Sequence, residues 1–117
     1  MYLDNIDDLI PYIENNPDCN IVVVKAHDCE ILIQSLVRNI NGKDITFFTL
    51  RNMCIPENMR HKGFFKNVVN TMISTDRNIM FHDVVNDYLK DYFTKMEYTH
   101  FIDVKNYHKL DCWYIEK

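Results

Sequence analysis

The spacing of hydrophobic residues along this chain changes several times, and each change marks a predicted element. Apolar residues recur at helical spacing in three segments: 2–16, 64–76 and 86–96. Short runs rich in β-branched and aromatic residues predict six strands: 19–27, 30–40, 44–55, 78–85, 98–104 and 110–117. The predicted order is one helix, three strands, helix, strand, helix and two strands. This order is typical of an α+β domain with a βαβα unit in its second half.

Two local signals refine this prediction. Pro11 lies inside the first helical pattern, so we expect that helix to be split or to begin late. Asn41-Gly42 separates two strand patterns and predicts a tight hairpin, because such a turn needs the positive φ that glycine adopts cheaply.

Composition limits the class of protein. A chain of 117 residues that is 47% hydrophobic predicts one folded domain over residues 1–117. The net charge of −4 argues against broad nucleic-acid or membrane-surface binding. No apolar run approaches the ~20 residues of a membrane span, and the acidic N-terminus lacks the features of a signal peptide. We therefore expect a cytoplasmic protein, in the host cytoplasm if it is viral.

Two further observations on composition carry less weight. The four cysteines form no CxxC pair and no ladder with zinc-like spacing, so we expect free cysteines and no metal site. The chain is rich in Asn, Asp, Ile and Lys and poor in Gly and Pro. Such a composition is associated with AT-rich genomes, including those of many bacteriophages.

The second of the two glycines is Gly63, which follows Arg60, His61 and Lys62 and precedes a helical pattern. Backbone N–H groups and the helix dipole favour an anion at such a helix start, and a glycine lets a phosphate approach the backbone closely. Arg60 and Lys62 add positive charge. The other interpretation is an ordinary strand-to-helix turn with solvated basic residues, and the residues alone leave both open.

This loop resembles the acetyl-CoA-binding motif of the GCN5-related N-acetyltransferase (GNAT) superfamily. That motif is Arg or Gln, two residues, Gly, one residue, then Gly or Ala, and the chain reads Arg60-His61-Lys62-Gly63-Phe64-Phe65, with Ile55 five residues ahead of Arg60. A second family pattern is matched by Asn86, Leu89, Tyr92-Phe93 and Glu97-Tyr98. Together the matches cover residues 20–117.

The resemblance implies a GNAT-like fold, with a mixed, mostly antiparallel sheet flanked by helices and a truncated N-terminal part. It also implies acetyl-CoA as the co-substrate. The backbone amides from Arg60 to Phe65 would bind the CoA pyrophosphate. The strand around Met53, Cys54 and Ile55 would pair with the pantetheine arm, splayed away from the strand 78–85. Asn86 would contact the arm or an ordered water.

Several positions depart from the family pattern. Phe65 replaces a small residue, and Glu97 replaces a glycine before the next strand. Phe93 stands where many relatives have the tyrosine that protonates the leaving thiolate, so we expect Tyr88, about one turn earlier, to be the acid.

The family's general base is also missing from its usual strand. Arg51 and Asn52 stand where relatives often have a carboxylate, so His82 is the expected base. His82 is expected within the strand 78–85, with Asp83 on its opposite side.

The N-terminal part is short, because only residues 1–19 precede the first predicted strand. The acceptor site would be open, completed by a second subunit of a homodimer, or absent. Three hypotheses follow. The chain is an acetyl-CoA-dependent N-acetyltransferase acting on an unknown small-molecule or protein amine. Alternatively, it is a catalytically weak or inactive binding or assembly module of that fold, or a small α+β interaction domain unrelated to it.

Overall fold

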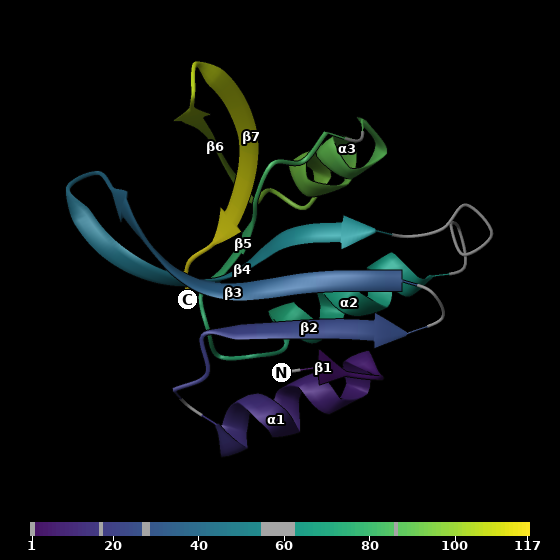
Figure 1. Ribbon diagram of the computed structural model, residues 1–117. Coiled ribbons are helices and arrows are strands. Elements are labelled where there is room, and N and C mark those ends of the chain that lie inside the picture. The colour runs from purple at the N-terminus through teal and green to yellow at the C-terminus, as the bar shows by residue number, and fades with distance from the viewer. Residues whose placement is uncertain (1, 17, 27–28, 55–62, 86) are drawn as a thin grey trace.

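The computed structural model describes residues 2–16, 18–26, 29–54, 63–85 and 87–117, with the backbone alone described at 26, 52–54, 64, 65 and 88. These residues form a seven-stranded sheet and three α-helices (Figure 1). The elements are β1 (Tyr2–Leu3), the 3-10 helix η1 (Ile6–Asp8), α1 (Leu9–Asn15), β2 (Ile21–Ala26), β3 (Cys29–Ile40), β4 (Lys43–Cys54), α2 (Phe64–Ile73), β5 (Ile79–Phe81), α3 (Asp87–Lys95), β6 (Thr99–Lys105) and β7 (His108–Ile115). Among the described helices, none combines the length and apolar character needed to span a bilayer.

The sheet is mixed and mostly antiparallel, with the strand order β1-β2-β3-β4-β5-β7-β6. Only the pairs β1–β2 and β4–β5 are parallel among the described strands. The predicted fold class is therefore confirmed. The β6–β7 hairpin stands at an angle to the strands β1 to β4, so the sheet is strongly twisted (Figure 1).

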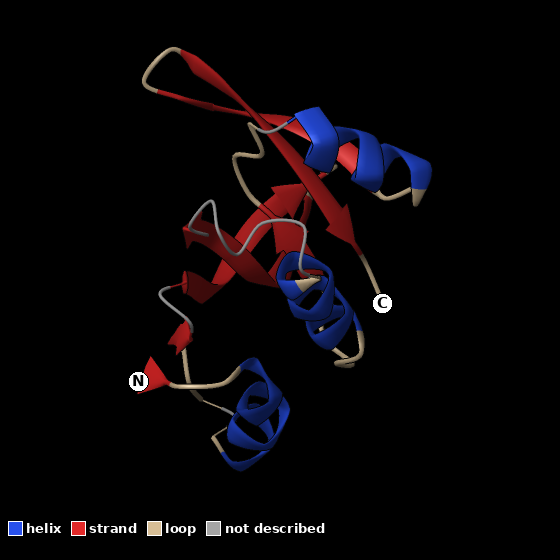
Figure 2. Cartoon of the chain, turned by 90° about the vertical axis from the view of Figure 1, so that its right-hand side faces the viewer, coloured by secondary structure: helices blue, strands red, loops and turns tan. Residues whose placement is uncertain are grey.

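The three helices lie on one face of the sheet, as Figure 2 shows. Apolar side chains from these helices and from strands β2, β3, β4, β5 and β7 form one core cluster between the helices and the sheet. The alternate residues of these strands point to the other face of the sheet, which we call the open face. Some of them, including Phe47 and Met80, form a smaller cluster there. Because helices cover only one side, polar residues on the open face remain accessible from that direction.

The N-terminal part confirms the predicted split of the first helix and contains one strand that was not predicted. The first helical pattern is split, with η1 capped by the Asn5 side chain at 3.0 Å from the N–H of Asp7, and α1 begins at Leu9. Pro11 is then the third residue of α1, where a missing N–H costs no hydrogen bond. The two-residue strand β1, parallel to β2, was not predicted, because two residues are too few to show a period.

The β3–β4 and β6–β7 hairpins use two-residue turns with positive φ. Asn41 (φ 52°) and Gly42 (φ 83°) join β3 to β4, which confirms the predicted turn. Asn106 (φ 51°) and Tyr107 (φ 67°) join β6 to β7 in the same conformation, without a glycine to signal it.

Candidate functional site

Strands β4 and β5 separate abruptly at the level of Leu50 and His82. Their parallel ladder ends with the Leu50–Phe81 pair and a 3.1 Å hydrogen bond from the His82 N–H to the Leu50 carbonyl. Two residues later the N–H of Val84 donates to the Asp111 carbonyl of β7 at 2.8 Å. β4 meanwhile continues to Cys54, so the predicted splay between these strands is confirmed.

β5 is shorter than the predicted strand 78–85, and this corrects the placement of two residues. His82 follows the strand instead of lying within it, and Asp83 adopts φ 57° in the left-handed region. The alternation argument that placed Asp83 on the opposite side of a strand therefore does not apply, because the extended backbone has already ended.

A β-bulge at Arg51 marks the same level on β4. Asn52 pairs with Leu32 and Leu50 pairs with Ile33, which leaves Arg51 as the extra residue. Bulges bend a strand, increase its twist and redirect a side chain. The bulge thus bends β4 away just where β5 leaves the ladder, and it places the Arg51 side chain at the edge of a pocket.

Gly63 begins α2 in the left-handed conformation, at φ 77° and ψ 2°. Its carbonyl accepts a 2.9 Å hydrogen bond from the N–H of Asn67, which is the first turn of the helix. A β-carbon added at Gly63 would meet no atom within 4 Å among the described residues. The glycine therefore serves a backbone conformation rather than tight packing, and the N–H groups of the first turn have no intrahelical acceptor. α2 is anchored by Val68, Val69 and Met72, which are buried in the core.

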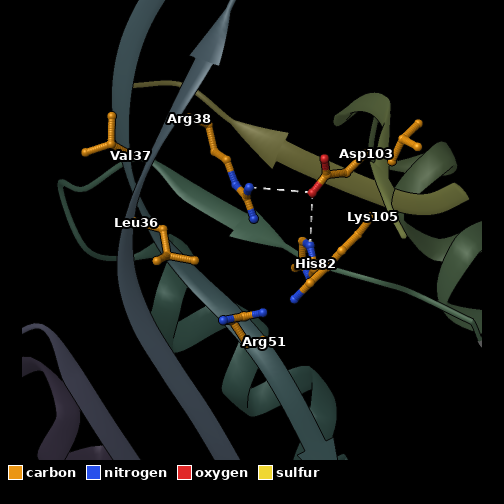
Figure 3. A pocket seen from close by; sticks show the side chains of 8 residues that line it. Leu36, Val37, Arg38, Arg51, His82, Asp103 and Lys105 are labelled. Carbon is orange, nitrogen blue, oxygen red and sulfur yellow. Dashed lines mark hydrogen bonds and ion pairs between the residues drawn. The ribbon is translucent and has the colours of Figure 1, made fainter. Parts of the chain in front are cut away.

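A pocket of about 320 Å³ opens on the open face beside the point of strand separation (Figure 3). It is lined by residues of β3, β4 and β6 and by His82: Leu36, Val37, Arg38, Arg51, His82, Asp103, Val104 and Lys105. Figure 3 shows Arg38 reaching from β3 toward Asp103 and His82 meeting the same carboxylate from the other side.

The polar groups in this pocket form a chain. Nε2 of His82 lies 3.4 Å from Oδ2 of Asp103, and the same oxygen lies 3.5 Å from a guanidinium nitrogen of Arg38. An Arg51 nitrogen donates to Oε1 of Gln34 at 3.3 Å. Donation from Nε2 to Asp103 leaves Nδ1 of His82 as the acceptor, so the carboxylate can select one tautomer of the ring.

Burial lowers the pKa of His82 below its ordinary value. Asp103 opposes this shift, whereas Arg38 and Arg51 add to it because they repel a second positive charge. The side chain is only 6% exposed, so desolvation is the expected dominant cause. His82 is therefore neutral near pH 7, the state in which it can accept a proton.

Phe93 lies in the core instead of facing a pocket. It is 1% exposed and stacks on Phe81 with ring centroids 4.5 Å apart. Its ring also lies 5.9 Å from Tyr98 and 5.8 Å from Trp113. A phenylalanine at this position therefore contributes to packing between α3 and the sheet.

The remaining predicted site residues divide into two groups. Those outside the described residues are Ile55, Arg60, His61, Lys62 and Asn86. Those whose backbone alone is described are Met53 and Cys54 at the end of β4, Phe64 and Phe65 at the start of α2, and Tyr88 in the first turn of α3. The structure thus has Gly63 at the start of α2 and Met53 and Cys54 in β4, as expected, whereas His82 lies just after β5. The roles of these residues remain predictions.

Sequence reasoning missed Asp103 and Arg38. Both lie on strands where alternation places a polar side chain on a solvent-facing surface, so nothing in the sequence distinguishes them from other solvated residues. In the sheet, β3 and β6 lie on either side of β4, β5 and β7. Only the folded structure shows that Asp103 of β6 contacts both Arg38 of β3 and His82.

No family model and no curated protein matches the sequence. Solved structures match at the level of the fold. One is a tyrosine-to-phenylalanine mutant of the AtaT toxin bound to the C-terminus of the antitoxin AtaR and to acetyl-CoA. It gives a TM-score of 0.53 at 10% identity, over 74% of this chain and 57% of the toxin chain.

A second match is NAA60 of Arabidopsis thaliana in complex with a bisubstrate analogue. Its TM-score is 0.46 at 11% identity, over 74% of this chain and 62% of the other, which is too low to establish a shared fold. Both proteins are GNAT acetyltransferases. The described part of this chain spans little more than half of the toxin's length and has a GNAT-like fold.

Proposed function

We propose that this protein is an acetyl-CoA-dependent N-acetyltransferase. The observation that carries the proposal is the separation of β4 from β5 at Leu50 and Phe81, with a bulge on one strand and His82 at the end of the other. The separation leaves backbone groups of β4 beyond Leu50 without β5 as a partner. An extended pantetheine arm can accept and donate hydrogen bonds there, as an added strand does.

The start of α2 supplies the other half of the cofactor site. Gly63, in its left-handed conformation, turns the chain into a helix whose first N–H groups are free of intrahelical acceptors. The positive end of the helix dipole adds to their attraction for a pyrophosphate. A similar fold binds acetyl-CoA in the AtaT structure, which supports this assignment of the ligand.

The two sides of the sheet would then have separate roles. α2 lies on the helical face, so CoA would approach from there, and the pocket around His82 lies on the open face. An amine entering this pocket would meet the thioester through the gap between β4 and β5. Holding amine and thioester in this geometry supplies a large part of the rate enhancement.

The proposed reaction is direct transfer. The neutral amine nitrogen attacks the thioester carbonyl carbon, so that a C–N bond forms and the C–S bond breaks. His82 takes the proton that the nitrogen loses, and the CoA thiolate leaves. Tyr88, at the start of α3, is the proposed donor of a proton to that thiolate. The products are the acetylated amine and free CoA thiol.

The test is release of CoA thiol from acetyl-CoA with a panel of primary amines, followed with a thiol reagent. We expect amine-dependent release, together with an increase in melting temperature on addition of CoA alone. Absence of both results would contradict the proposal.

A second candidate function is a binding module of this fold without catalysis, and one observation favours it. Phe93 has no proton to donate and is packed in the core at the position where relatives have their acid. Stabilisation by CoA without any amine-dependent turnover would favour this second function.

A further inference from the structure

We propose that the acceptor amine carries an anionic group, a carboxylate or a phosphate, which the pocket around His82 binds. This inference rests on the proposed function in naming the anion as part of an acceptor.

Three cations and one carboxylate line the pocket: Arg38, Arg51, Lys105 and Asp103. With His82 neutral, three positive charges less one negative charge leave an excess of two. The whole chain has a net charge of −4, so this is a positive pocket in an acidic protein. A concave site of one sign concentrates ligands of the opposite sign.

The single carboxylate is already engaged. Asp103 Oδ2 contacts Arg38 at 3.5 Å and His82 at 3.4 Å. No carboxylate lies within ion-pair distance of Arg51 or Lys105 in the part of the chain that the structure describes. These two cations therefore have charge to offer a ligand.

Arg51 is the better placed of the two. The bulge turns it toward the pocket, and its 3.3 Å hydrogen bond to Gln34 uses a neutral acceptor and holds the guanidinium in place. Arg38 also retains donor capacity, since its buried Nε has no hydrogen-bond partner among the described residues. A planar guanidinium with unused donors binds carboxylate or phosphate oxygens in pairs.

The same charges disfavour other acceptors. A polyamine or a lysine side chain would bring an ammonium into a pocket that already has excess positive charge. An amine without an anionic group would gain no electrostatic attraction from Arg51 or Lys105. An amine that carries its own anion is attracted by the cations, and the cations also favour the uncharged form of its nitrogen, which is the form that attacks the thioester.

The test compares amines in matched pairs with acetyl-CoA. The pairs are β-alanine with β-alaninamide, and phosphoethanolamine with ethanolamine, and cadaverine represents a cationic acceptor. We expect kcat/KM to be at least about tenfold higher for the amine that carries a carboxylate or phosphate than for its partner without that group. This is the difference expected for one charge-assisted hydrogen bond. The two pairs show whether a carboxylate or a phosphate is preferred.

The variants are Arg51→Gln and Lys105→Gln, with Lys95→Gln as the control. Lys95 is an exposed cation at the end of α3, on the helical face, so its loss changes the net charge without touching the pocket. We expect both pocket variants to raise KM for the anionic amine while KM for acetyl-CoA and the melting temperature stay constant. Lys105 is exposed, so its variant is expected to fold even if the bulge variant does not.

A binding measurement without turnover separates this inference from the proposed function. NMR follows the His82 Cε1–H resonance while β-alanine or phosphoethanolamine is added. Saturable shifts that Arg51→Gln abolishes, without acetyl transfer to any amine, would support the anion site and contradict the proposed function. Acetyl transfer with no preference for the anionic amines would overturn the inference alone, as would the absence of any saturable shift.

Discussion

Nε2 of His82 lies 3.4 Å from Oδ2 of Asp103, although the two residues are 21 positions apart in the sequence. The contact crosses the open face from the end of β5 to β6, beside the place where β4 and β5 separate. A neutral imidazole that is oriented by a carboxylate and lines a pocket has the features of a general base.

The pH dependence of turnover tests this role. Burial lowers the pKa of His82, so kcat/KM calculated for the concentration of uncharged amine should rise with pH along a limb centred below the ordinary value of about 6.5 and stay level above it. His82→Gln should lower kcat by about 10²–10⁴-fold and remove the limb. Asp103→Asn should move the limb to lower pH, because the carboxylate raises the pKa of His82. A limb centred above the ordinary value would contradict the assignment.

Stability should depend on pH through the same residue. The folded pKa of His82 is lower than the unfolded pKa, so between the two values the unfolded chain binds more protons. The contribution of His82 to the free energy of unfolding should therefore be fully present above about pH 6.5 and be lost as the pH falls through the lowered pKa. Urea unfolding of the wild type and of His82→Gln at several pH values measures the difference. Equal slopes for the two proteins in this window would show that His82 keeps its ordinary pKa.

Cofactor binding is tested at the two glycines. Gly63 (φ 77°) and Gly42 (φ 83°) have similar conformations, and an added β-carbon meets no described atom within 4 Å at either position. Gly63→Val and Gly42→Val should therefore each cost roughly 1–2 kcal/mol or more of stability through backbone strain. Only Gly63→Val should lose the increase in melting temperature that CoA produces, because its side chain fills the space where a pyrophosphate would lie. Equal CoA affinity in the two variants would remove α2 from the binding site.

Two substitutions in α3 test whether a side chain of this helix protonates the leaving thiolate. Tyr88→Phe should lower kcat by about 10²-fold if Tyr88 protonates the thiolate. Phe93→Tyr should not raise turnover, because its ring is packed in the core, and the added hydroxyl should cost about 1–3 kcal/mol of stability. Steady-state kinetics and thermal unfolding of both variants measure these effects. A rise in turnover for Phe93→Tyr would show that a hydroxyl at this position does reach the thiolate.

The end of α3 offers a stabilising substitution. Glu97 has φ 60°, and the bonds from Tyr98 N–H to Phe93 O (3.2 Å) and from Glu97 N–H to Thr94 O (3.1 Å) form a Schellman cap. Glycine adopts this conformation without the steric cost, so Glu97→Gly should stabilise the protein by about 0.5–1 kcal/mol. Calorimetry should show a melting temperature higher by about 2–5 °C. Glu97→Ala removes the charge but keeps a β-carbon on a backbone with positive φ, so it should give no such gain.

The sequence by itself determined the elements that have a strong local period or a turn signal. Asn41-Gly42 predicted the β3–β4 hairpin, and the apolar spacing around Val68 and Met72 predicted α2. Gly63 predicted a special backbone conformation before α2, and the structure has it in the left-handed region, whereas its part in a cofactor loop stays a prediction. These features depend on residues close in sequence, so local physics is sufficient to predict them.

Only the tertiary structure decided which polar residues meet. In the sequence, Arg51 stands where a catalytic carboxylate is expected, whereas in the structure the bulge places it at a pocket. β5 ends at Phe81, so His82 lies outside the strand. Asp103 contacts both His82 and Arg38 because β6 and β3 curve toward each other across the open face of a twisted sheet. Pairing register and twist arise from contacts between strands that are distant in sequence, and the alternation within a single strand contains no information about them.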